Sequence, residues 1–257
     1  MMVFIGLIML IENPKGNYSF LKGIAPYSGG AIASRGFAIE HARLQPALPL
    51  HAGFSAVDKH LKAMGRPRQA LCAMELRSPR PFTFQGFADF NAGYVDILKS
   101  WEILQNGLTP VARTNVAPEV DPPTEPMLYA FSYTVPSGQE ANTFVVAGSG
   151  EIPGGSADPH DVIRRGETSP EALREKVRFV LGAMESRLHE LGADWLDVTT
   201  TDVYTVHDIH PLLAHEILPR LGAAKRHGIT WHYTRPPIVS IEYEMDLRGC
   251  PREIVIR

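Results

Sequence analysis

The chain has 257 residues, of which 44% are hydrophobic and 21% are charged, so it can bury a substantial core and is neither disordered nor fibrous. Its 25 Lys and Arg residues against 28 Asp and Glu residues give a formal net charge of −3, which is too balanced to attract a polyanion by charge alone. These figures argue against a dedicated nucleic-acid binder or a membrane-surface binder.

The two cysteines and the first residues predict the compartment. Cys72 and Cys250 lie far apart and show no Cys-x-x-Cys spacing, so neither a disulfide framework nor a thiolate zinc site is indicated. A reducing cytoplasm is expected. The apolar stretch 1–11 is shorter than the about 20 residues that span a bilayer, and it lacks the basic start and the cleavage site of a signal peptide. We interpret it as a buried strand, or as the result of a start codon placed before Met9.

The first half of the chain alternates helices and strands. A helix is predicted over 54–64, because Phe54, Val57 and Leu61 recur at helical spacing before Gly65. A strand is predicted over 70–76, and a second helix, with an aromatic stripe, over 87–104. Strands over 111–116 and 127–135 follow. Prolines and polar residues between 118 and 142 then predict a boundary near residue 140, with domains 1–140 and 141–257.

The second half repeats this order. After a strand over 143–147, Ser169 is a candidate N-cap and Pro170 suits the first helical position. Apolar residues then recur at three- and four-residue steps up to Gly192. A strand over 197–206, a helix over 212–221 and strands over 229–233, 238–245 and 253–256 complete the prediction. Gly65 and Gly192 lie 127 positions apart, which favours duplication of one α+β unit, a mixed sheet backed by two helices.

A few polar residues stand out as candidates for chemistry. Arg113 lies on an apolar strand, where it is either one partner of a salt bridge or a two-point clamp for a substrate carboxylate. Asn91 is either an exposed helix residue or an amide that contacts a ligand. Glu242 and Glu244 alternate with apolar residues on one strand face. That face is either solvated or closed by a neighbour, and closure would raise the pKa of one carboxyl.

Two other kinds of site receive little support. His207, His210 and His215 are close in sequence, but they straddle a strand end and a turn and match no known metal-ligand spacing. The glycine-rich run 148–155 follows a strand, yet it lacks the lysine and the immediate helix of a phosphate-binding loop. We therefore expect no metal and no cofactor.

Short motifs in both halves resemble the RidA/YjgF family of enamine and imine deaminases. The first half carries Ile24-Ala-Pro-Tyr-Ser28, Phe87-Ala-Asp-Phe-Asn91 followed by Tyr94, and Pro110-Val-Ala-Arg-Thr-Asn-Val116. The second half carries Ala147-Gly-Ser-Gly-Glu-Ile-Pro153, Leu191-Gly-Ala-Asp-Trp-Leu-Asp-Val-Thr-Thr200 and Ile241-Glu-Tyr-Glu244. The resemblance implies two tandem domains of the chorismate-mutase-like fold, a homotrimer, and sites between adjacent domains.

The resemblance also implies roles for single residues. The substrate-clamping arginine of the family corresponds to Arg113, its N-terminal tyrosine to Tyr27 and its catalytic glutamate to Glu242. The chain departs from the family in that the last strand of the first half has no glutamate, and the second half has no arginine in the Pro-Ala-Arg context. One composite site per chain or per subunit interface is compatible with this pattern, and so is a protein without activity.

The leading hypothesis is a hydrolase that acts on a small carboxylate-bearing enamine or imine, derived from an amino acid or resembling an aminomuconate, and releases ammonia. Arg113 would hold the carboxylate and Glu242 would position water, while Tyr27 and Asn91 would wall the pocket. Backbone N–H groups near Thr114 and Asn115 would polarise the developing negative charge. The alternatives are a chorismatase-like lyase or hydrolase and a ligand-binding regulatory trimer without turnover. RNA cleavage is the least favoured because the chain has no basic stripe.

Overall fold

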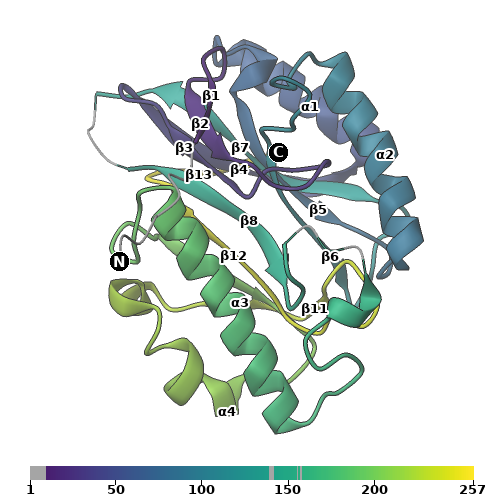
Figure 1. Cartoon of the computed structure of the whole chain (residues 1–257). Coiled ribbons are helices and arrows are strands. Elements are labelled where there is room, and N and C mark those ends of the chain that lie inside the picture. The colour runs from purple at the N-terminus through teal and green to yellow at the C-terminus, as the bar shows by residue number, and fades with distance from the viewer. Residues whose placement is uncertain (1–9, 139–141, 155, 157) are drawn as a thin grey trace, which may run out of the picture.

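In a computed structural model of the protein, the described residues are 10–138, 142–154, 156 and 158–257. The fold is α+β, with two mixed sheets in the middle and helices on their outer faces (Figure 1). Residues 1–9 of the predicted opening strand, and the part of the 136–142 linker from 139 to 141, lie outside the described residues. Within the described chain, no helix is long and apolar enough to cross a membrane.

One sheet has six strands in the order β11-β6-β5-β7-β4-β13. Its bounds along the chain are β4 (Phe37–Pro49), β5 (Leu71–Arg77), β6 (Ala112–Pro118), β7 (Met127–Pro136), β11 (Thr234–Arg235) and β13 (Glu253–Ile256). Helices α1 (Leu50–Ala63) and α2 (Phe84–Ser100) bury their apolar faces on it, and one hydrophobic cluster joins all three parts.

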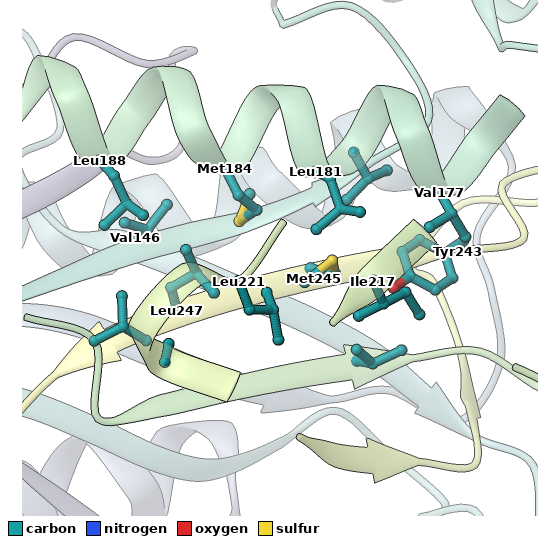
Figure 2. Packing of buried hydrophobic residues seen from close by; sticks show 14 of the residues in the cluster. Val146, Val177, Leu181, Met184, Leu188, Ile217, Leu221, Tyr243, Met245 and Leu247 are labelled. Carbon is teal, nitrogen blue, oxygen red and sulfur yellow. The ribbon is translucent and has the colours of Figure 1, made fainter. Parts of the chain in front are cut away.

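The second sheet has seven strands in the order β1-β2-β3-β8-β12-β9-β10. Its bounds are β1 (Ile11–Asn13), β2 (Tyr18–Leu21), β3 (Gly30–Ala33), β8 (Phe144–Gly150), β9 (Thr200–Tyr204), β10 (Thr230–His232) and β12 (Glu244–Gly249). Helix α3 (Pro170–Glu190) covers its outer face. In Figure 2 the α3 side chains Val177, Leu181, Met184 and Leu188 face Val146 of β8 and Met245 and Leu247 of β12.

The two sheets share one strand arrangement. The order β6-β5-β7-β4 in the first matches β10-β9-β12-β8 in the second. The first pair of each set is parallel and the other two pairs are antiparallel. A third hydrophobic cluster, which includes Phe20, Cys72 and Val145, fills the space between the sheets.

Each sheet also takes strands from both sides of residue 140. The N-terminal strands β1 to β3 join the second sheet, because β3 pairs with β8. From the C-terminal part, β11 pairs with β6 and β13 pairs with β4. The sequence break near residue 140 falls between β7 and β8, while the sheets themselves are composite.

Local signals predicted the long helices well. The prediction at Ser169 is confirmed, because its Oγ accepts a hydrogen bond of 3.2 Å from the backbone N–H of Ala172 and α3 begins at Pro170. The predictions over 54–64 and 87–104 correspond to α1 and α2. Gly65 and Gly192 follow α1 and α3 with φ of 65° and 74°, in the left-handed region where glycine is the least strained residue.

Two element predictions are wrong. The helix predicted over 212–221 is broken into α4 (His210–Leu212), a π-helical turn (Leu213–Ile217) and a 3-10 segment (Gly222–His227). Pro219 lies within that stretch and cannot supply the N–H that a continuing helix needs. The strand predicted over 238–245 begins only at Glu244, because the N–H groups of Glu242 and Tyr243 donate to the carboxylate of Glu151 instead of a neighbouring strand.

Candidate active site

The guanidinium of Arg113 lies buried between β6 and α2. Its Nη2 donates to Asn91 Oδ1 at 2.6 Å. The rings of Tyr27 and Tyr94 each have their centroid 4.7 Å from its Cζ, a distance at which an arginine and an aromatic face attract each other. Arg113 is 3% exposed, and its buried Nη1 has no hydrogen-bond partner among the described residues. A buried guanidinium with an unsatisfied donor fits a site that takes an anionic group.

Helix α2 supplies the wall of this site. Phe87, Asn91 and Tyr94 recur at four- and three-residue steps and are buried on one face of the helix. Phe87 and Phe90 place their rings 5.4 and 5.7 Å from the guanidinium of Arg113. Burial lowers the pKa of Arg113, and nearby groups, Tyr94 first among them, oppose that effect. The aromatic rings pack against the faces of the Arg113 guanidinium, so a ligand would bind at its edge.

Glu244, at the start of β12, is the carboxyl group that acts on Arg113. The side chain is 4% exposed in the second sheet. A Cβ on Gly148 would collide with Glu244 Oε1 and would lie 3.1 Å from Thr114 Oγ1, so the carboxyl group lies against the β8 backbone beside β6. Burial raises the pKa of Glu244 well above its usual value, Asp246 and Glu151 add to this, and Arg187 and Arg113 oppose it. Glu244 is therefore a buried carboxyl group with a raised pKa, and two arginines lie close enough to oppose that rise.

A buried ion pair fixes the chain just before Glu244. Glu151 accepts hydrogen bonds from the backbone N–H groups of Glu242 at 2.6 Å and Tyr243 at 3.0 Å. Lys176 of α3 lies 3.0 Å from the same carboxylate, and both side chains are 0% exposed. A fully paired buried carboxylate that binds two successive backbone N–H groups determines the direction in which the next residue points.

Glu242 itself lies elsewhere. Its carboxylate is 2.8 Å from Nε2 of His207, which lowers the pKa of Glu242, and its charge is not among those that act on Arg113. The structure thus brings Arg113 into contact with Tyr27 and Asn91, places Glu244 within electrostatic range of it, and does not bring Glu242 to them. The expectation that both glutamates share one strand face is wrong, because Glu242 precedes the strand.

The neighbours of Arg113 on β6 have other contacts. Thr114 turns to the opposite face, where its hydroxyl donates to Asp246 Oδ2. Asn115 lies on the same face as Arg113. Its Oδ1 accepts from Ser78 at 2.9 Å, and its buried Nδ2 has no partner among the described residues. The sequence had not singled out Arg187 of α3, whose charge acts on both Tyr27 and Glu244, because nothing local distinguishes it from other helix arginines.

A cluster of groups that resemble metal ligands lies beside Thr114, the neighbour of Arg113 on β6. Glu75, Asp202 and Asp246 place carboxylate oxygens within 4.8 Å of one another. Arg248 Nη1 lies 2.5 Å from Asp202 and 3.8 Å from Glu75, so a guanidinium already provides the counter-charge in this cluster. In the described chain, His207 contacts Glu242 and His210 contacts Asp208, so these two histidines contact separate acids.

Comparison with known proteins identifies relatives of this chain. A model of the family described as 2-aminomuconate deaminase CnbZ matches residues 10–254. The 2-amino-5-chloromuconate deaminase of Comamonas testosteroni is 48% identical over 245 residues, which are 94% of this chain and 96% of that protein.

Solved structures are more distant. A chorismatase aligns with a TM-score of 0.47 and 11% identity, covering 95% of this chain and 80% of its own. A putative endoribonuclease from Thermotoga maritima aligns with a TM-score of 0.26 and 18% identity, over 42% of this chain and 78% of its own. The family match over most of the length and the 48% identity are the findings that classify the chain: it belongs to the 2-aminomuconate deaminase family.

Proposed function

We propose that this protein hydrolyses the enamine of a 2-aminomuconate-type substrate and releases ammonia. The observation that carries the proposal is Arg113, whose buried Nη1 lacks a partner among the described residues, with Glu244 within its electrostatic range as a buried carboxyl group of raised pKa. The first group suits a substrate carboxylate and the second suits proton transfer near neutral pH. Family membership and the named activity of the relative from Comamonas testosteroni support the same reaction.

The chemistry needs one group that both gives and takes a proton. Neutral Glu244 donates its proton to the ring-opened enamine at carbon, which produces an iminium ion while Arg113 holds the adjacent carboxylate. The carboxylate of Glu244 then accepts a proton from water as the water oxygen adds to the iminium carbon. Proton transfer to nitrogen expels ammonia and leaves a keto acid, so one water is consumed for each ammonia released. In this scheme Glu244 takes the part that the sequence had assigned to Glu242.

We also propose that residues 1–140 and 141–257 are two RidA-like units of the chorismate-mutase-like fold, and that the protein is a homotrimer. The strand order common to both sheets supports a duplicated unit, and the resemblance to a trimeric family supports the assembly. Light scattering on the purified protein measures the mass of the assembly, and any mass other than that of three chains contradicts the trimer.

The reaction is tested by ammonia release from 2-aminomuconate with the wild type, Arg113→Lys and Arg235→Lys. Arg113→Lys keeps the charge but loses the planar two-point contact, and we expect kcat/KM to fall by about 10²–10³-fold. Arg235 pairs with the half-exposed Glu119 at 2.6 Å, so Arg235→Lys is the matched control and should remain within about twofold of the wild type.

The other outcomes have distinct readings. Release of pyruvate from chorismate without release of ammonia from the aminomuconate would support the chorismatase-like alternative. Binding of the aminomuconate without turnover would support the regulatory alternative. Near-normal turnover by Arg113→Lys would contradict the role of Arg113.

A further inference from the structure

A second arginine lies beside the same site. Arg187 extends from α3, and its Nη1 donates to the carbonyl oxygens of Ala147 at 2.8 Å and Gly148 at 3.4 Å. Gly148 is also the residue against which the carboxyl group of Glu244 lies. The carboxyl group of Glu244 and the guanidinium of Arg187 therefore both lie against the β8 backbone at Gly148.

The two arginines act on the same groups. Burial raises the pKa of Tyr27, and both Arg113 and Arg187 lower it. Both arginines also oppose the rise in the pKa of Glu244. Burial lowers the pKa of Arg187 itself, as it does for Arg113. Tyr27 and Glu244 are thus within electrostatic range of two guanidinium groups, one from strand β6 and one from helix α3.

This arrangement leaves positive charge in excess. Arg113 contacts the Asn91 amide and aromatic rings, and Arg187 contacts backbone carbonyls, so among the described residues neither guanidinium forms an ion pair. The nearby carboxylates have partners of their own: Glu190 accepts a hydrogen bond from Ser186, and Glu151 pairs with Lys176 at 3.0 Å. Asp246 accepts a hydrogen bond from the hydroxyl of Tyr204 at 2.9 Å. Excess buried charge is costly unless a ligand brings the counter-charge.

The two guanidinium groups differ in depth. Arg113 is buried, whereas Arg187, Tyr27 and Phe90 are half-buried and so lie nearer the surface. In the described chain, Nε and Nη2 of Arg187 make no hydrogen bond, since only Nη1 is used by the β8 carbonyls. A ligand with one anionic group at each end could engage the deep arginine and the outer one together.

We infer that Arg187 is a specificity-determining residue that binds the second carboxylate of a linear dicarboxylate, so that the site selects dianions over monoanions. The inference rests on the proposed function, because it assigns Arg113 to the carboxylate next to the reacting carbon. A muconate skeleton carries a carboxylate at each end of a conjugated four-carbon chain, and is therefore the class of ligand that the charge arrangement fits.

The test uses two ligands that carry no amino group and cannot be deaminated. Muconate has two carboxylates, and sorbate has the same six-carbon diene skeleton with one. Isothermal titration of the full-length wild type should show muconate binding about tenfold or more tightly than sorbate. Arg187→Met should reduce muconate affinity to within about threefold of sorbate affinity and leave sorbate affinity unchanged.

Two further variants keep the result interpretable. Arg178→Met is the matched control, since Arg178 lies on the same helix, is exposed and pairs with Glu216, and it should leave both affinities unchanged. Arg187→Lys retains the charge and should keep part of the preference for muconate, which covers the case in which Arg187→Met fails to fold.

Several results would overturn the inference. They are an equal affinity of the wild type for both ligands, an equal loss of both ligands in Arg187→Met, and a preference for muconate that survives the loss of Arg187. Because binding is measured without turnover, absence of ammonia release from 2-aminomuconate would count against the proposed reaction and would leave this result standing.

Discussion

The two sheets have corresponding strands, β6 and β10, that differ in charge. Strand β6 of the first sheet pairs Arg113 with Met74 of β5, while β10 of the second pairs Trp231 with Val203 of β9. Strand β10 contains no arginine.

The strands that supply the acid differ in the same way. In β12, Glu244 precedes Met245, which pairs with Val203. In β7, Ala130 precedes Phe131, which pairs with Met74, and β7 contains no carboxylate. The shared strand order therefore presents two equivalent places for a charged pair, and the chain uses one of them, with the arginine from one half and the acid from the other.

The two places also differ in whether their buried polar groups have hydrogen-bond partners. Arg113 and Glu244 are both almost fully buried, and Nη1 of Arg113 has no hydrogen-bond partner among the described residues. On the other strand, Trp231 donates from Nε1 to the carbonyl oxygen of Thr205 at 3.0 Å and packs edge-on to His210. The indole N–H of Trp231 thus has a hydrogen-bond partner, whereas one nitrogen of the Arg113 guanidinium has none among the described residues. This is expected if Trp231 serves packing alone.

The largest expected effect separates the two glutamates. Glu244→Gln removes the proton that the proposed mechanism transfers, so kcat for ammonia release should fall by about 10²–10⁴-fold. Glu242→Gln removes only the contact with half-buried His207 and should remain within about threefold. The two positions are two residues apart in the chain, so they are matched controls for each other. A larger loss of kcat in Glu242→Gln than in Glu244→Gln would mean that Glu242 is the proton donor, as the sequence had indicated.

An intermediate effect is expected in stability against pH. Burial, with Asp246 and Glu151 nearby and Arg187 and Arg113 opposing, raises the pKa of Glu244 in the folded state. The folded protein therefore retains this proton at pH values where the unfolded chain, with an ordinary pKa near about 4.3, has released it. The contribution of this group to stability is present below the unfolded pKa and is lost as pH rises through the folded pKa.

Glu244→Gln cannot ionise, so it should lose less stability than the wild type as pH rises above the ordinary carboxyl pKa of about 4.3. Thermal unfolding measures the difference, with Tm changing by about 2–4 °C for each kcal/mol. Parallel curves for the two proteins would show that Glu244 has an ordinary pKa.

The smallest effect is expected at β10, the strand without an arginine. Trp231→Phe removes the hydrogen bond to Thr205 and keeps an aromatic ring, so kcat/KM for the aminomuconate should stay within about twofold while Tm decreases slightly. A large loss of activity with an unchanged Tm would mean that this strand takes part in the reaction, and the asymmetry between the two strands would then need another explanation.

The sequence by itself predicted the helices whose capping residues and apolar spacing lie within one continuous segment. Helix α3 followed from Ser169, Pro170 and the apolar steps up to Gly192, and α2 placed Asn91 and Tyr94 on one face. Arg113 could be selected because a charged residue inside an apolar strand is unusual at the level of the sequence alone. These signals are periodic or positional, so a single segment contains them.

Strand β4, in contrast, went unpredicted. Its residues Glu40 and His41 are buried with distant partners: Glu40 accepts from the hydroxyl of Tyr133 at 2.8 Å, and His41 lies 3.1 Å from the hydroxyl of Ser132. No local pattern could show those partners, because they lie about a hundred residues away along the chain.

Only the tertiary structure decided which segments meet. The sequence placed β1 to β3 with the first half and β13 with the second, and the sheets exchange them. Which glutamate acts on Arg113 depends on the Glu151–Lys176 pair, which binds the backbone just before Glu244. Arg187 is held at the site by its hydrogen bond to the carbonyl oxygen of Gly148. These residues come from distant segments of the chain. The periodicity of a sequence shows which face of a helix or strand is buried. The groups that pack against that face come from elsewhere in the chain. Their charge and distance determine the pKa of a carboxyl group and whether an arginine has a partner.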